Sequence, residues 1–173
     1  MKDVLVRAAR AHVLRVVRAQ EDFPERGACL LYALAALGVG KVLGVRLVLQ
    51  AGTATWPFVA PELDDGVSAN SFGYEWDPEH LRSSHALALG LMPEMHVWAG
   101  DPVAQEVVDL STEHWPAQRA MLMGGDSGWT GPRPPVWLWG KPPARVVYLP
   151  NAEATAHATR LAKMFLKENQ GTF

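Results

Sequence analysis

Apolar residues recur at helical spacing at both ends of the chain. Over the first twenty residues they alternate with arginines, which predicts an amphipathic helix whose arginines form its solvated face. Residues 151–169 predict a second amphipathic helix, with Asn151 or Thr155 as its N-terminal cap. Residues 29–43 are apolar or small at every helical position, which predicts a buried helix that ends at Gly44.

Strand patterns occupy much of the remainder. One face of the buried helix is lined mainly with small side chains, which is typical of a helix that lies close against a sheet. This face holds Cys29, Ala33, Ala36, Leu37 and Gly40. The β-branched and alternating runs that predict strands are residues 45–56, 71–76, 136–139 and 144–149, together with a hairpin over 95–112. Residues 114–122 predict one or two helical turns. The pattern therefore predicts an α+β fold.

Length, charge and cysteine content narrow the classes of protein. With 173 residues, 49% of them hydrophobic, we expect a single domain over residues 1–173 with helices at its N- and C-termini. The net charge of -2 gives no reason to expect binding to nucleic acid, and no apolar run predicts a membrane span. The single cysteine excludes an internal disulfide and favours a cytoplasmic location.

The predicted hairpin holds two polar residues that a core normally avoids. His96 lies on its first strand and Asp109 on its second. A register that sets His96 opposite Asp109 also pairs Val97 with Val108 and centres the turn near residues 102–103, which places both polar side chains on one face. A carboxylate beside an imidazole orients the ring and stabilises the imidazolium.

Cys29 is the candidate nucleophile that this pair would serve. It opens the buried helix, where the helix dipole favours a thiolate and free backbone N–H groups can hold an oxyanion. One alternative start remains open, because the segment 22–25, DFPE, resembles a capping box. A helix that began there would place Cys29 about two turns inside and remove the effect of the dipole.

These residues resemble the transglutaminase-like branch of the papain-like cysteine enzymes. The resemblance covers residues 27–52, GACLLYALAALGVGKVLGVRLVLQAG, and resumes at HVW and DLS within 95–111. It implies a papain-like fold in which the helix bearing Cys29 packs on an antiparallel sheet. It also implies a triad in which Cys29 is the nucleophile, His96 the general base and acid, and Asp109 the orienting carboxylate. Phe23 stands where papain-type enzymes carry an oxyanion-binding glutamine.

The resemblance implies thiol acyl transfer through a thioester on Cys29, with a peptide, protein or small amide as substrate. We expect hydrolysis rather than transfer to an amine, because so small a chain has few segments to exclude water; residues 124–135, rich in Gly and Pro, are the candidate lid. The tryptophans predicted to contact substrate are Trp98, Trp137 and Trp139.

Two alternatives compete with catalysis. Cys29 can be a small buried hydrophobe and His96 with Asp109 a structural pair, in which case the chain is an inactive papain-like fold that binds a peptide or protein. A metal site built on His80, His85 and His96 is disfavoured by their spacing, since residues five apart do not share a helix face. We therefore predict no metal and no cofactor.

Overall fold

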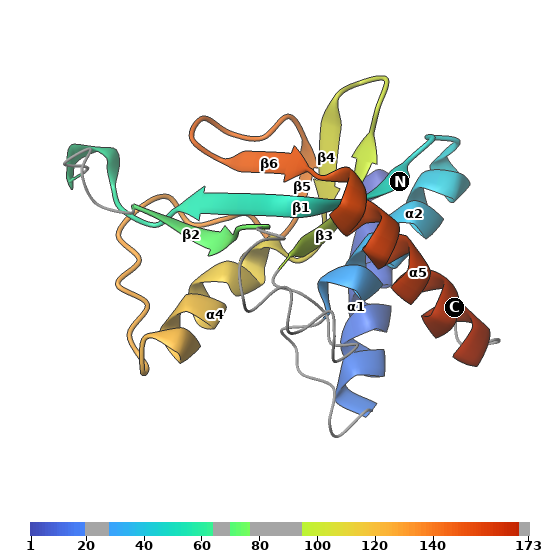
Figure 1. Ribbon diagram of the computed structural model, residues 1–173, viewed down its shortest axis with the longest axis horizontal. Coiled ribbons are helices and arrows are strands. Elements are labelled where there is room, and N and C mark those ends of the chain that lie inside the picture. Colours follow the sequence, from blue (N-terminus) through green and yellow to red (C-terminus); the bar gives the residue numbers. More distant parts are fainter. Residues whose placement is uncertain (20–27, 64–69, 77–94, 170–173) are drawn as a thin grey trace.

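The fold is built on a six-stranded antiparallel sheet with helices packed against it (Figure 1). This computed structural model describes residues 1–19, 28–63, 70–76 and 95–169, and the numbers of strands and helices concern those residues. The strands are β1 (Val48–Pro57), β2 (Ser71–Tyr74), β3 (His96–Asp101), β4 (Glu106–Asp109), β5 (Leu138–Gly140) and β6 (Val147–Pro150). The helices are α1 (Lys2–Ala19), α2 (Cys29–Leu43), α4 (Trp115–Leu122) and α5 (Ala152–Glu168), with short 3-10 turns at η2 (Pro61–Leu63) and η3 (Thr112–His114). The predicted α+β class is confirmed.

Strand β1 organises the sheet, because three other strands pair with it. Residues 48–52 pair with β3, residues 54–57 pair with β2, and residues 52–55 pair with β6. Gly52 lies opposite both His96 and Pro150. A Cβ atom at this position would collide with backbone atoms just before α5, and its φ of +156° also favours glycine. Glycine at position 52 therefore lets the backbone before α5 lie close against β1, at the residue that pairs with His96.

Helices α1, α2 and α5 gather at one end of the view in Figure 1, and α4 lies apart from them. Helix α2 contacts β3 and β4, α5 contacts β1, and α1 packs on α2. The small side chains of α2 are buried as predicted, and a Cβ at Gly40 would come within 2.8 Å of the Leu47 side chain. Helix α2 ends at Gly44 with a left-handed φ of 71°, which confirms the predicted stop.

The prediction for the arginines of α1 is wrong at Arg10. The buried residues of this helix are Val6, Arg10, Val13 and Val17. The Arg10 guanidinium donates to the backbone oxygen of Leu110 at 2.9 Å and pairs with Glu113. Burial of an arginine is tolerated here because its charge and its hydrogen-bonding groups are satisfied. Sequence periodicity cannot reveal such a partner, since it lies about a hundred residues away.

Helix α5 is joined to β1 by its first turn. The Asn151 side chain accepts hydrogen bonds from the backbone N–H groups of Glu153 and Ala154, which confirms the predicted cap. The Thr155 hydroxyl accepts from the N–H of Ala51 at 3.0 Å and donates to its carbonyl at 3.2 Å. These bonds hold the start of α5 beside the strand that pairs with β3.

The hairpin of β3 and β4 forms, but two residues out of the predicted register. Ala99 pairs with Val108 and Asp101 pairs with Glu106, so the turn spans residues 102–105 rather than centring near 102–103. The Asp101 carboxylate accepts from two backbone N–H groups of this turn, which favours the longer connection. Because side chains alternate along a strand, a shift of two residues leaves His96 and Asp109 on one face.

The Gly- and Pro-rich segment predicted as a candidate lid is bonded to the end of β1. The backbone N–H groups of Thr130 and Gly131 both donate to the carbonyl of Phe58 at 2.8 Å, and the Trp129 ring lies 6.3 Å from the Phe58 ring. Arg119 donates to the backbone oxygen of Ser127. A lid movement of this segment would have to break these bonds.

Candidate active site

Cys29 is the first residue of α2. The preceding residue, Ala28, has φ -71° and ψ -11° and provides no side-chain cap. The start at Cys29 decides between the two helix starts that the sequence left open, and residues 22–25 lie outside the described residues. The thiol therefore lies at the positive end of the helix dipole. Cys29 is 8% exposed.

His96 and Asp109 meet at the ends of their strands. His96 is the first residue of β3 and Asp109 the last of β4, and Nε2 of the imidazole lies 2.7 Å from Oδ2 of the carboxylate. Both residues are 2% exposed. A buried charged pair at this distance is a strong, oriented hydrogen bond rather than a surface ion pair.

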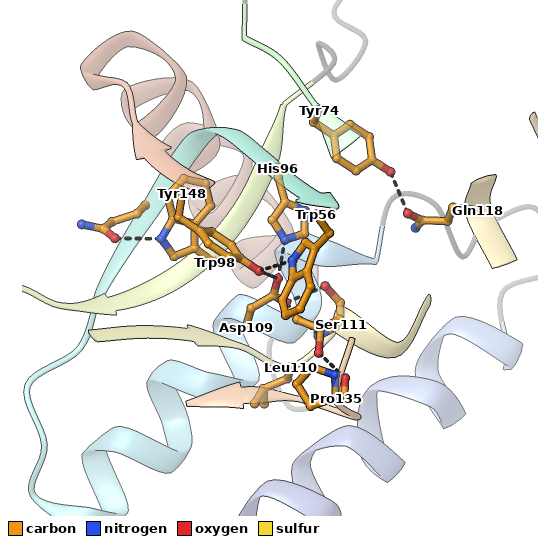
Figure 2. A network of polar contacts seen from close by, with 12 residues as sticks. Trp56, Tyr74, His96, Trp98, Asp109, Leu110, Ser111, Gln118, Pro135 and Tyr148 are labelled. Atoms are coloured by element: carbon orange, nitrogen blue, oxygen red, sulfur yellow. Dashed lines mark hydrogen bonds and ion pairs between the residues drawn. The ribbon is translucent and has the colours of Figure 1, made fainter. Parts of the chain in front are cut away.

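Asp109 accepts hydrogen bonds from three residues (Figure 2). Oδ2 accepts from His96 and from the Tyr148 hydroxyl, each at 2.7 Å. Oδ1 accepts from the backbone N–H and the hydroxyl of Ser111, at 2.8 and 2.7 Å. The Tyr148 oxygen in turn accepts from the indole N–H of Trp56 at 3.3 Å. Every carboxylate oxygen is thus paired twice, which compensates the cost of burying the charge.

The electrostatics of the pair follow from these contacts. Burial alone would lower the pKa of His96, but the charge and hydrogen bond of Asp109 outweigh it and raise the pKa from 6.5 to about 10. Burial alone would raise the pKa of Asp109, yet His96, Ser111 and Tyr148 together lower it. At neutral pH the pair is therefore an imidazolium beside a carboxylate.

Cys29 interacts with the same imidazole. The Cys29 side chain, through hydrogen bonding and electrostatic attraction, is a further cause of the raised pKa of His96. Nε2 is taken by Asp109, and Nδ1 is buried without a well-aligned hydrogen-bond partner among the described residues. Contacts between a nucleophile and its base are often loose before substrate binds. The structure thus brings together the three residues that the sequence predicted as a triad.

Aromatic rings surround His96 on several sides. Tyr74 and Trp98 stack nearly parallel to the imidazole, with ring centroids at 5.7 and 6.0 Å. Trp115 meets it edge-on at 5.0 Å, and Tyr148 lies tilted at 6.2 Å. These rings exclude water from the ion pair. The charged form of the buried imidazole therefore depends on its neighbour Asp109.

The three tryptophans predicted to contact substrate separate into two places. Trp98 lies against His96, donates to the Gln50 side chain at 2.8 Å and is 1% exposed. Trp137 and Trp139 pack instead with the core cluster that includes α1, where Arg7 and Lys2 lie over their respective rings. The structure does not bring these two rings to His96. A role for all three in substrate binding remains a prediction.

Sequence reasoning missed the residues around the His96–Asp109 pair, among them Tyr74, Ser111, Trp115 and Tyr148. Ser111 had a local signal, because it follows Asp109 by two residues within the DLS motif, where a hydroxyl can bond back to the carboxylate. Tyr148 had none, since only the pairing of β6 with β1 brings it near.

The histidines other than His96 do not build a metal site in the described ranges. Among the described residues no group of three or more His, Cys, Asp or Glu side chains could hold a metal ion. His80 and His85 lie outside these residues. In the described part of the chain, no helix combines the length and the apolar character that crossing a membrane requires.

No family model, no curated protein and no solved structure matches the chain. Function is therefore inferred from the geometry of the site.

Proposed function

We propose that the protein is a cysteine-dependent amide or peptide hydrolase with a papain-like, transglutaminase-like fold, acting through a thioester on Cys29. The observation that carries the proposal is that Asp109 and Cys29 interact with the same buried imidazole. A carboxylate on Nε2 leaves Nδ1 as the nitrogen that exchanges a proton at the thiol side. A core histidine that only satisfied Asp109 would not need a cysteine at a helix start beside it.

The reaction follows from these positions. The Cys29 thiolate attacks the substrate carbonyl carbon, and the carbonyl electron pair moves to oxygen. As the C–N bond breaks, His96 gives its Nδ1 proton to the departing amine and a thioester remains. The neutral imidazole then takes a proton from water as the water attacks the thioester, and the thiolate leaves. Asp109 holds the ring orientation throughout.

Two sets of donors are available for the oxyanion. The first-turn N–H groups of α2 have no side-chain cap. The indole N–H of Trp76 is buried without a hydrogen-bond partner among the described residues, and this ring packs in one cluster with Cys29 and Met95. An unpaired buried donor is costly unless a ligand satisfies it, which makes Trp76 our candidate for the side-chain donor.

The test is covalent trapping. The protein is mixed with p-nitrophenyl acetate, and intact mass and peptide mapping then locate any acetyl group. We expect one acetyl group on Cys29, formed in the wild type and absent in Cys29→Ala and His96→Gln. Asp101→Asn, a change in the exposed hairpin turn, is the control variant and is expected to react like the wild type. Absence of acetylation in the folded wild type would favour the inactive binding module.

The fate of the acyl group separates hydrolysis from transfer. We expect the acetyl-enzyme to decay in water alone, with little acceleration by millimolar primary amine. Decay that is negligible in water and rapid with amine would instead assign the protein as an acyltransferase.

A further inference from the structure

Tyr148 reaches the site from the last strand of the sheet. Its hydroxyl donates to Asp109 Oδ2 at 2.7 Å, which is the same oxygen and the same distance as the bond from His96 (Figure 2). The two donors come from different strands, β6 and β3, and both of these strands pair with β1. Tyr148 and His96 therefore share a single acceptor atom.

The direction of the hydrogen bonds is fixed by chemistry. An indole N–H can only donate, so the Tyr148 oxygen is the acceptor in its 3.3 Å bond with Trp56. The phenolic hydrogen is then free to point only toward Asp109. Burial and the neighbouring carboxylate raise the pKa of Tyr148 well above its ordinary value, so the hydroxyl stays a neutral donor over the working range of pH.

We propose that Tyr148 is a positioning residue that sets the acidity of His96 by sharing Oδ2 of Asp109 with it. This inference rests on the proposed function of Cys29. Each donor withdraws charge from the carboxylate oxygen, and a second donor therefore weakens the hold of that oxygen on the imidazolium proton. The imidazolium is then acidic enough to give its Nδ1 proton to a leaving group. Trp56 acts indirectly, because its hydrogen bond holds the Tyr148 hydroxyl in place.

The substitution Tyr148→Phe isolates this effect because it removes the hydroxyl and keeps the ring. Oδ2 would then bond to His96 alone, the imidazolium would hold its protons more tightly, and protonation of a basic leaving group would slow. A leaving group that departs without a proton would be unaffected. The signature is therefore a dependence on the leaving group, which a loosened fold would not produce.

The experiment compares acetylation of Cys29 by p-nitrophenyl acetate, whose leaving group needs no proton, with acetylation by the less activated phenyl acetate, each across the pH range. For Tyr148→Phe we expect a loss of about threefold to tenfold on phenyl acetate, the size of one hydrogen bond, and no loss on p-nitrophenyl acetate. The alkaline limb of the pH profile should move to higher pH. Trp56→Phe should lower the rate on phenyl acetate and move the alkaline limb to higher pH as well, each by a smaller amount.

Tyr32→Phe is the matched control, since it removes another buried tyrosine hydroxyl whose bond goes to His114 and not to Asp109. We expect it to leave the ratio of the two rates unchanged. Equal losses on both esters with an unmoved pH profile, or no change at all, would overturn the role of Tyr148. If Tyr148→Phe does not fold, an unchanged ratio and profile in folded Trp56→Phe would overturn it. If the wild type is not acetylated at Cys29, the proposed function itself fails, and the inference fails with it.

Discussion

The two ends of the His96 ring differ in how completely their polar groups are paired. At the carboxylate end, Asp109 accepts from His96, Tyr148 and Ser111, and both of its oxygens are paired twice. At the thiol end, Nδ1 of His96 and the indole N–H of Trp76 have no well-aligned hydrogen-bond partner among the described residues. Proteins satisfy buried polar groups almost everywhere, so the proposed function would place substrate at this thiol end, which we call the open end.

The largest effect is expected from removing the Asp109 carboxylate, which is the acceptor at the fully paired end. Asp109→Ala leaves a buried imidazolium and the donors of Tyr148 and Ser111 without their acceptor. We expect the free energy of unfolding in urea to fall by about 3–5 kcal/mol. Asp101→Ala removes a carboxylate that accepts two turn N–H groups at the exposed hairpin, and should cost about 1 kcal/mol. Equal losses of unfolding free energy in the two variants would show that the hydrogen bonds of Asp109 stabilise the fold no more than those of Asp101.

The open end is tested by Trp76→Phe. Phenylalanine keeps most of the buried ring but has no N–H to offer an oxyanion. We expect acetylation of Cys29 to slow by about 10²–10³-fold. Alkylation by iodoacetamide passes through no oxyanion and should keep its rate. Trp129→Phe, which loses a bond to Pro132 on the surface, is the control for removal of an indole N–H. A matching fall in alkylation would show that Trp76 only packs against its neighbours.

His96 lies between the two ends, and its positive charge should increase the reactivity of the Cys29 thiol. Under the proposed function the imidazolium activates Cys29, so we expect iodoacetamide to alkylate Cys29 at pH 6 faster in the wild type than in His96→Gln, by about tenfold or more. Circular dichroism spectra of the two proteins establish that both are folded. Equal rates would remove the electrostatic link between His96 and Cys29.

The last prediction concerns the dependence of folding stability on pH. A histidine whose pKa is raised to about 10 contributes stability that is fully present below its unfolded value near 6.5 and is lost as pH rises through 10. The advantage in unfolding free energy of wild type over His96→Gln should therefore shrink with rising pH across this window, by at most about 1.4 kcal/mol per pH unit. An advantage that stays constant or grows would mean that His96 is neutral in the folded protein.

What the sequence could predict of this site depended on local signals. Gly44 and Asn151 mark helix ends by their own chemistry, whereas the sequence left two starts open for α2. His96 and Asp109 were placed on one face correctly although the register was wrong, because only the parity of the shift matters. The register itself depended on the length of the turn after Asp101.

What could not be predicted depended on pairing between distant segments. Tyr148 reaches Asp109 only because β6 pairs with β1, and no pattern near residue 148 indicates that contact. The same holds for Arg10. Its charge predicts exposure to solvent, but the side chain is buried beside Glu113 and the carbonyl of Leu110. Periodicity reports which face of an element is buried, and it carries no information about which partner makes burial of a charge acceptable.

The bond from Arg10 to Leu110 also bears on how the chain can be shortened. Leu110 directly follows Asp109, and its carbonyl is satisfied from α1. Trimming the amino-terminal helix to obtain a smaller crystallisable fragment would remove that guanidinium and leave a buried acceptor unpaired one residue from the carboxylate. A truncated protein that expressed well but had lost reactivity would then report a damaged frame around Asp109, and should not be taken as evidence that Cys29 is inert.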